Sequence, residues 1–161
     1  MALRNIVTKE DPFLLKKCRP VDKFDERLAQ LLDDLAETMY NANGAGLAAI
    51  QVGILRRALV IDAGEGLKEL VNPVILEQSG EQDGLEGCLS FPGEWGMVKR
   101  PQHVKVKAQD RNGHTFEYEG DDLLARASCH EIDHLDGILF PTRASRMLTP
   151  DELEEMATKG D

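Results

Sequence analysis

Apolar residues recur at helical spacing in two segments of the chain. In residues 25–41 they fall three or four positions apart, which predicts an amphipathic helix with one buried stripe. Either Asp22 or Asp25 can cap its start, and the Asn43-Gly44 pair ends it. The residues of this stripe, which we assign to the core, are Leu28, Leu31, Leu32, Leu35 and Met39.

A second helix is predicted to begin near Asp121 or Asp122, either of which can cap it, and to end at Asp136-Gly137. Residues at positions i, i+4, i+7 and i+11 share one face of a helix. In this segment those positions hold two apolar residues and two histidines, namely Leu123, Ala127, His130 and His134.

Between these helices the pattern changes to the shorter period of β-strands. Strands are predicted at residues 57–62, 74–77, 104–108 and 114–118, and a turn at 110–113 joins the last two into a hairpin. Thr149, Pro150 and Glu152 form a capping box that predicts a short C-terminal helix through about Ala157. We therefore expect an α+β fold with mainly antiparallel sheets, an N-terminal helix and a short C-terminal helix.

Composition narrows the possible partners. The 161 residues fit a single domain over 1–161, with 42% apolar and 30% charged residues. A formal net charge of −10 disfavours nucleic acid or membrane as the main partner. No apolar run is long enough for a signal peptide or a membrane span, so we expect a cytoplasmic protein. Three cysteines, an odd number, argue against a disulfide framework.

The most specific chemical signal is the pair of histidines one helical turn apart. His130 and His134 can bind one metal ion together, and Glu131 lies beside them at the position of a general base that does not ligate the ion. The second helix would then be the central, metal-binding helix of the fold. The alternative is a chance pair of histidines on a surface helix.

Catalytic metal sites usually have three protein ligands. The acidic residues downstream of the histidines belong mostly to the polar C-terminal helix, and we expect them to be solvated. Cys88 lies upstream in a glycine-rich segment whose backbone path we expect to be fixed and unusual. Its thiolate would suit a soft or borderline divalent ion.

Three segments of the chain resemble the signature motifs of peptide deformylases. Residues 44–51 resemble the Gly-x-Gly-Leu-Ala-Ala-x-Gln motif, residues 86–90 (Glu-Gly-Cys-Leu-Ser) the second motif, and residues 130–137 the third. The resemblance extends from about Ile6 to Arg143. One departure is Cys129, which stands where many members have glutamine and would add a second thiol close to the metal.

This resemblance implies metal-dependent hydrolysis of the formyl group on the N-terminal N-formylmethionine of new polypeptides, releasing formate. It implies one Fe²⁺ ion per chain, replaceable by Zn²⁺ or Ni²⁺, with water at the fourth position. The ligands would be Cys88, His130 and His134, and Glu131 would be the general base and acid. The side-chain amide of Gln51 and the backbone N–H of Leu89 would stabilise the oxyanion.

The substrate peptide is expected to bind in extended form beside the glycines, like an added strand. An apolar pocket should receive the methionine side chain, with Trp95 as a candidate for its rim. The expected substrate-binding residues are Ala45, Gly46, Gly87, Leu123 and Ala127.

Two rival functions share the histidine motif. A zinc endoprotease would need a third ligand from the tail, such as Glu152. A structural metal site would need Cys129 as a fourth protein ligand. A diverged family member acting on another acylated amine is a further alternative. Asp133 can be either a residue supporting the ligands or a surface acid, whereas His103 and His114 are expected at the surface. The acid-rich tail predicts at most a weak contact with the ribosome.

Overall fold

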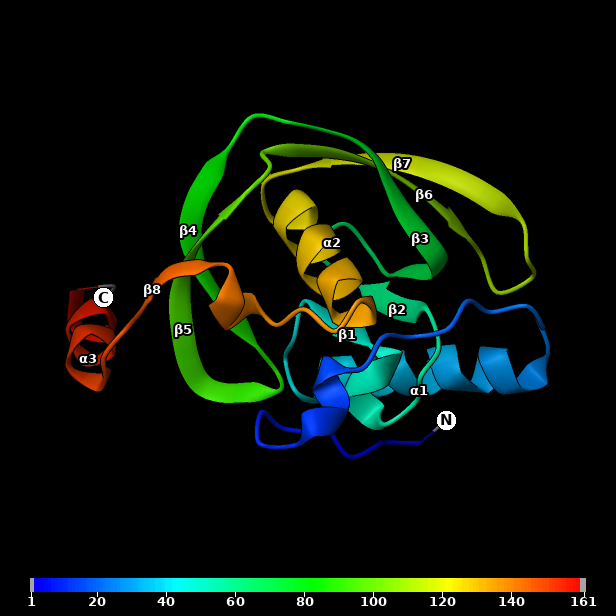
Figure 1. Cartoon of the computed structure of the whole chain (residues 1–161), viewed down its shortest axis with the longest axis horizontal. Coiled ribbons are helices and arrows are strands. Elements are labelled where there is room, and N and C mark those ends of the chain that lie inside the picture. The colour runs from blue at the N-terminus through cyan, green and yellow to red at the C-terminus, as the bar shows by residue number, and fades with distance from the viewer. Residues whose placement is uncertain (1, 160–161) are drawn as a thin grey trace.

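A largely buried helix, α2 (Asp122–Leu135), lies between two antiparallel sheets in the computed structural model, which describes residues 2–159 and the side chains up to Met156 (Figure 1). One sheet has five strands in the order β1-β2-β3-β6-β7, and the other has three in the order β4-β5-β8. The expected α+β fold is confirmed. The strands are β1 (Gly46–Ala48), β2 (Ala58–Ile61), β3 (Lys68–Ser79), β4 (Gln82–Cys88), β5 (Phe91–Arg100), β6 (His103–Gln109), β7 (Thr115–Asp121) and β8 (Ala144–Met147).

Helix α1 (Glu26–Asn41) begins and ends as its sequence pattern predicts. The Asp25 carboxylate accepts a hydrogen bond from the backbone N–H of Leu28, which satisfies one of the free donors of the first turn. At the other end of the chain, α3 (Pro150–Lys159) begins with the predicted capping box, because Thr149 and Glu152 bond each other's backbone N–H groups. Three short 3-10 helices complete the elements: η1 (Pro12–Leu15), η2 (Ala49–Val52) and η3 (Phe140–Thr142).

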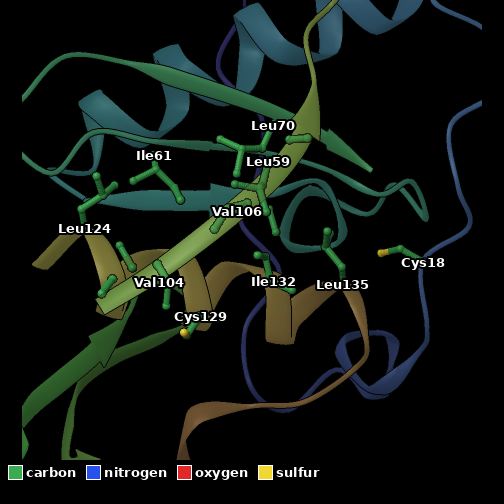
Figure 2. Close-up of a cluster of buried hydrophobic side chains, with 14 of the residues drawn as sticks. Cys18, Leu59, Ile61, Leu70, Val104, Val106, Leu124, Cys129, Ile132 and Leu135 are labelled. Atoms are coloured by element: carbon green, nitrogen blue, oxygen red, sulfur yellow. The ribbon is translucent and has the colours of Figure 1, made fainter. Parts of the chain in front are cut away.

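The core lies on both faces of β2. Its residues alternate, so that Leu59 and Ile61 pack toward α2 while Ala58 and Val60 pack toward α1. Figure 2 shows the cluster beside α2, where Leu124, Cys129 and other helix residues meet side chains of β2, β3 and β6. Each such large aliphatic side chain contributes roughly 1.5–3 kcal/mol on burial. This packing holds α2, and with it both histidines, against the larger sheet.

The structure differs from the sequence-based prediction at several places; strands β1, β5 and β8, for example, were not predicted. A strand was expected only after Asn72, but strand β3 continues across this residue. Asn72 adopts a φ of 51°, and its side-chain amide accepts a hydrogen bond from the backbone N–H of Val21 and donates one to the Val21 carbonyl. The segment ending at Cys88 is a strand, and the expected irregular path is limited to a shift in its pairing with β5 between Glu86 and Cys88. Asp121 occupies the N-cap of α2 but makes no capping hydrogen bond there, since its carboxylate pairs with His103.

None of the helices within residues 2–159 combines the length and the apolar character needed to cross a bilayer.

Candidate metal and catalytic site

Cys88 and the two helix histidines come together although they lie in separate elements. His130 and His134 project from one face of α2, and Cys88 ends β4, which passes over that face. Their three ligating atoms lie within 4.8 Å of one another, and Cys88 Sγ is 3.3 Å from His134 Nε2. One thiolate and two imidazoles form a donor set that suits a borderline divalent ion. These residues could therefore hold a metal.

Glu131 is buried beside this group of ligands. Its Oε2 lies 3.9 Å from His130 Nε2, and its Oε1 has no hydrogen-bond partner among the described residues. A buried carboxylate oxygen without a partner is costly unless water, substrate or an ion completes it. Burial raises the pKa of Glu131 to about 7, which is the range in which a carboxyl group can both take and return a proton. The unpartnered oxygen supports the fit of a metal with its associated water.

Gln51, at the end of the first motif, faces the same centre. Its Oε1 accepts the backbone N–H of Ala48, which fixes the orientation of the amide. Its Nε2 therefore points the other way, 3.0 Å from Ser90 Oγ and 3.5 Å from Cys88 Sγ. The side chain is only 1% exposed, so its N–H donors lie beside Cys88 and Ser90 and away from bulk solvent. Ser90 itself was not singled out by the sequence pattern.

Glu86 is hydrogen-bonded to His130 on the side of the ring away from the ligand group, a role that the sequence analysis did not predict. Its Oε2 accepts a 2.6 Å hydrogen bond from His130 Nδ1, which leaves Nε2 for a metal. Arg100 bonds both carboxylate oxygens of Glu86, and Arg126 bonds Oε1. Although burial raises the pKa of Glu86, the hydrogen bonds from His130 and Arg100 lower it to about 2. The carboxylate is therefore ionised at neutral pH.

Asp133 extends this network. The sequence left open whether it supports the ligands or is a surface acid. Its carboxylate accepts hydrogen bonds from Arg100 and from Arg143, so it is a partly buried ion-pair residue next to the ligands and not a free surface acid. Because Arg100 connects Asp133 to Glu86, the network joins α2, β4 and β5. Glu, Asp and Arg are usually exposed, and nothing in their spacing indicated this buried cluster.

A cavity of about 480 Å³ opens beside Glu131. It lies between β1 and β4, each of which is an edge strand of its sheet, so both strands have backbone groups free to pair with a further strand. The predicted substrate-binding residues all line it: Ala45, Gly46, Gly87, Leu123 and Ala127.

Glycine is required at two points of this cavity wall. A Cβ at Gly46 would lie 2.7 Å from Glu131 Cγ and Oε2, so the absent side chain lets β1 pass directly over the carboxylate. A Cβ at Gly87 would lie 2.7 Å from the Trp95 ring. Trp95 is 43% exposed and Leu123 is 49% exposed, which places both at the mouth of the cavity. The predicted rim position of Trp95 thus has geometric support.

The other candidate residues lie away from the described metal-ligand group. Cys129 packs in the hydrophobic cluster of Figure 2, where burial raises the pKa of its thiol to about 11, so a place among the ligands is not supported. Glu152 is bonded to Arg146 and Thr149 at the start of α3. His103 pairs with Asp121 and Glu119, and His114 is exposed. The arrangement required by either rival function is therefore not formed by these residues.

Comparison with known proteins agrees with this geometry. Residues 3–149 match the family model described as polypeptide deformylase. The chain is 59% identical to a peptide deformylase of Caldicellulosiruptor bescii over all of this chain and 97% of that protein. It is 57% identical to one of Caldanaerobacter subterraneus over 96% of this chain and 97% of the relative. The crystal structure of the Thermotoga maritima peptide deformylase superposes with a TM-score of 0.88 at 41% identity, covering 91% of this chain and 100% of the other.

Proposed function

This chain belongs to the polypeptide deformylase family, whose hydrolases remove the formyl group from the N-terminus of new polypeptides, and we propose that Glu131 and Gln51 carry out that reaction here. The observation that supports this most directly is the buried, unpartnered Oε1 of Glu131 beside Cys88 and His130. A carboxylate in that position is suited to move a proton between water and substrate.

Cys88, His130 and His134 would hold one metal ion. We propose Fe²⁺ as the native ion, because the family resemblance implies it, and Zn²⁺ or Ni²⁺ could replace it, because a thiolate with two imidazoles can bind all three. When bound, such an ion polarises a carbonyl oxygen and lowers the pKa of water toward neutrality. Glu86 would keep the His130 ring in the orientation that presents Nε2, as its hydrogen bond to Nδ1 indicates.

The formylated peptide would bind as an extended strand between β1 and β4, pairing with backbone groups near Ala45, Gly46 and Gly87. Its first side chain would enter the cavity that Leu123 and Ala127 help to line. This placement would bring the formyl group to Glu131, because β1 passes so close to that carboxylate that a Cβ at Gly46 would lie 2.7 Å from Glu131 Oε2.

Glu131 would take a proton from water as the water oxygen attacks the formyl carbon, and would pass that proton to the amine when the carbon–nitrogen bond breaks. The products are formate and a free N-terminal amine. Gln51 Nε2 and the backbone N–H of Leu89 would donate hydrogen bonds to the oxygen that becomes negative, and losing one such donor typically costs roughly 3–4 kcal/mol in the barrier. The fixed amide orientation of Gln51 supports this role.

The substrate also indicates where the protein works and with what. Formylated chains are made in the cytoplasm, so we propose a cytoplasmic enzyme acting on nascent polypeptides. Any contact of α3 with the ribosome should be weak, because its first turns carry Asp151, Glu152, Glu154 and Glu155 and would be repelled by RNA. Salt-dependent co-sedimentation of the protein with ribosomes through this helix would contradict that expectation.

Formate release from a formyl-Met peptide tests the proposal, using protein loaded with ferrous iron under anaerobic conditions. The Glu131→Gln variant should retain the metal, and its kcat should be lower by roughly 10²- to 10⁴-fold, because only the proton carrier is removed. The control Glu81→Gln changes an exposed acid outside the site and should leave the rate unchanged. Wild-type rates in the Glu131→Gln variant would show that another residue moves the proton.

A further inference from the structure

An arginine lines the cavity next to its apolar residues. Arg126 lies on α2 one turn before His130 and is 8% exposed, and it is one of the residues that line the cavity, together with Ala127. Its guanidinium lies against β4 at Gly84, where a Cβ would be in ordinary van der Waals contact with Arg126 Nη2, at 3.4 Å. A pocket for a purely hydrocarbon side chain would have no need of a buried cation, because burying charge is costly.

The neighbouring carboxylates do not fully satisfy this guanidinium. Within residues 2–159 it has one hydrogen bond, from Nη1 to Glu86 Oε1 at 2.9 Å. Glu86 is shared with Arg100 and His130, and the other acid of the network, Asp133, is shared between Arg100 and Arg143. Three arginines thus meet two carboxylates. Because Arg126 lines the cavity, the donors that its single hydrogen bond to Glu86 leaves over could serve a group bound there.

We propose that Arg126 determines specificity for the first side chain of the substrate by donating a hydrogen bond to an acceptor at the end of that side chain. A thioether sulfur is a weak acceptor, whereas a sulfoxide oxygen is a strong one. Formylated peptides whose first methionine is oxidised to the sulfoxide therefore bind and are deformylated. The inference rests on the proposed use of this cavity for the first side chain.

Three formylated peptides that differ only at the first residue test this proposal, with methionine, methionine sulfoxide or norleucine at that position. The quantity to compare is kcat/KM for the sulfoxide peptide divided by kcat/KM for the norleucine peptide, measured by formate release. The wild-type ratio should be at least about 1. In Arg126→Leu it should fall by roughly 10-fold or more, the effect expected for losing a hydrogen bond from a charged group.

Two matched variants separate this effect from general damage. Arg126→Lys keeps a cationic donor and should retain most of the wild-type ratio. Arg146→Leu removes an exposed arginine of β8, which is paired with Glu152, and should leave the ratio unchanged. The proposal is overturned if Arg126→Leu has the wild-type ratio, or if the wild-type protein hydrolyses the norleucine peptide but not the sulfoxide peptide.

Binding of the deformylated products, measured by titration calorimetry, gives a readout that needs no turnover. The sulfoxide product should bind more tightly than the norleucine product to the wild type, and Arg126→Leu should remove that preference by a similar factor. If this preference were found while no peptide released formate, the proposed function would be wrong and the role of Arg126 would stand. If formate were released but neither the ratio nor the binding preference depended on Arg126, only this inference would fall.

Discussion

Oε2 of Glu86 lies 2.6 Å from Nδ1 of His130, and neither residue is more than 5% exposed. This contact fixes the tautomer in which His130 Nε2 is free to bind a metal. Glu86 is in turn held by Arg100 and Arg126, so the position of one ligand depends on charges contributed by β5 and by an earlier turn of α2. The metal site is therefore supported by a buried ion-pair network and not by helix geometry alone.

Replacing Glu86→Gln should weaken metal binding roughly 10- to 100-fold, because the amide cannot neutralise the two arginines or hold the imidazole as firmly. Competition with a chelator measures this affinity directly. The exposed Glu81→Gln variant is the matched control and should bind metal like the wild type. Equal affinity in both variants would mean that the network contributes to folding but not to the site.

Replacing Gly46→Ala should reduce kcat/KM by about 100-fold, since the new methyl group would displace the Glu131 carboxylate from its position. Gly46 does not have a positive φ, so alanine causes no backbone strain there. Thermal unfolding and metal content should therefore remain near those of the wild type. Full activity in Gly46→Ala would indicate that the Glu131 carboxylate can act from a position other than the one beneath Gly46.

The titration of His103 gives a prediction about charge near the start of α2. Hydrogen bonds from its ring to Asp121 and then Glu119 raise its pKa above its ordinary value near 6.5. The stabilisation that the charged ring provides is complete below that ordinary value and is lost as pH rises through the raised pKa. NMR titration of the ring should show a midpoint above 6.5, and Asp121→Asn should lower it. A midpoint at or below 6.5 in the wild type would contradict the pairing.

The parts of the molecule that were predictable from sequence depend on local periodicity. The stripe of α1 and the spacing of His130 and His134 follow from 3.6 residues per turn, and the cap at Asp25 is formed as expected. The structure also brings Cys88 to the histidines and Gln51 to Cys88, as the three motifs suggested. Their roles in binding metal and substrate remain predictions that the experiments above address.

The features that were missed depend on long-range contacts. Strand β4 contains two glycines and two acids, which have low strand propensity, and it forms because β5 pairs with it. Glu86 meets Arg126 across 40 positions of the chain, and although Glu86 belongs to the second motif, nothing in the sequence pairs it with Arg126. Asp121 or Asp122 was expected to cap α2, but the carboxylate of Asp121, at the N-cap position, is hydrogen-bonded to His103.

The central claim is that Cys88, His130 and His134 bind one ion together, and substitution with Co²⁺ tests it most directly. A thiolate ligand gives the bound cobalt a sulfur-to-metal charge-transfer absorption that imidazole and carboxylate ligands do not give. We predict that this band is present with one equivalent of cobalt in the wild type and in Cys129→Ala, and absent in Cys88→Ala. An undiminished band in Cys88→Ala, or its loss in Cys129→Ala, would contradict the account.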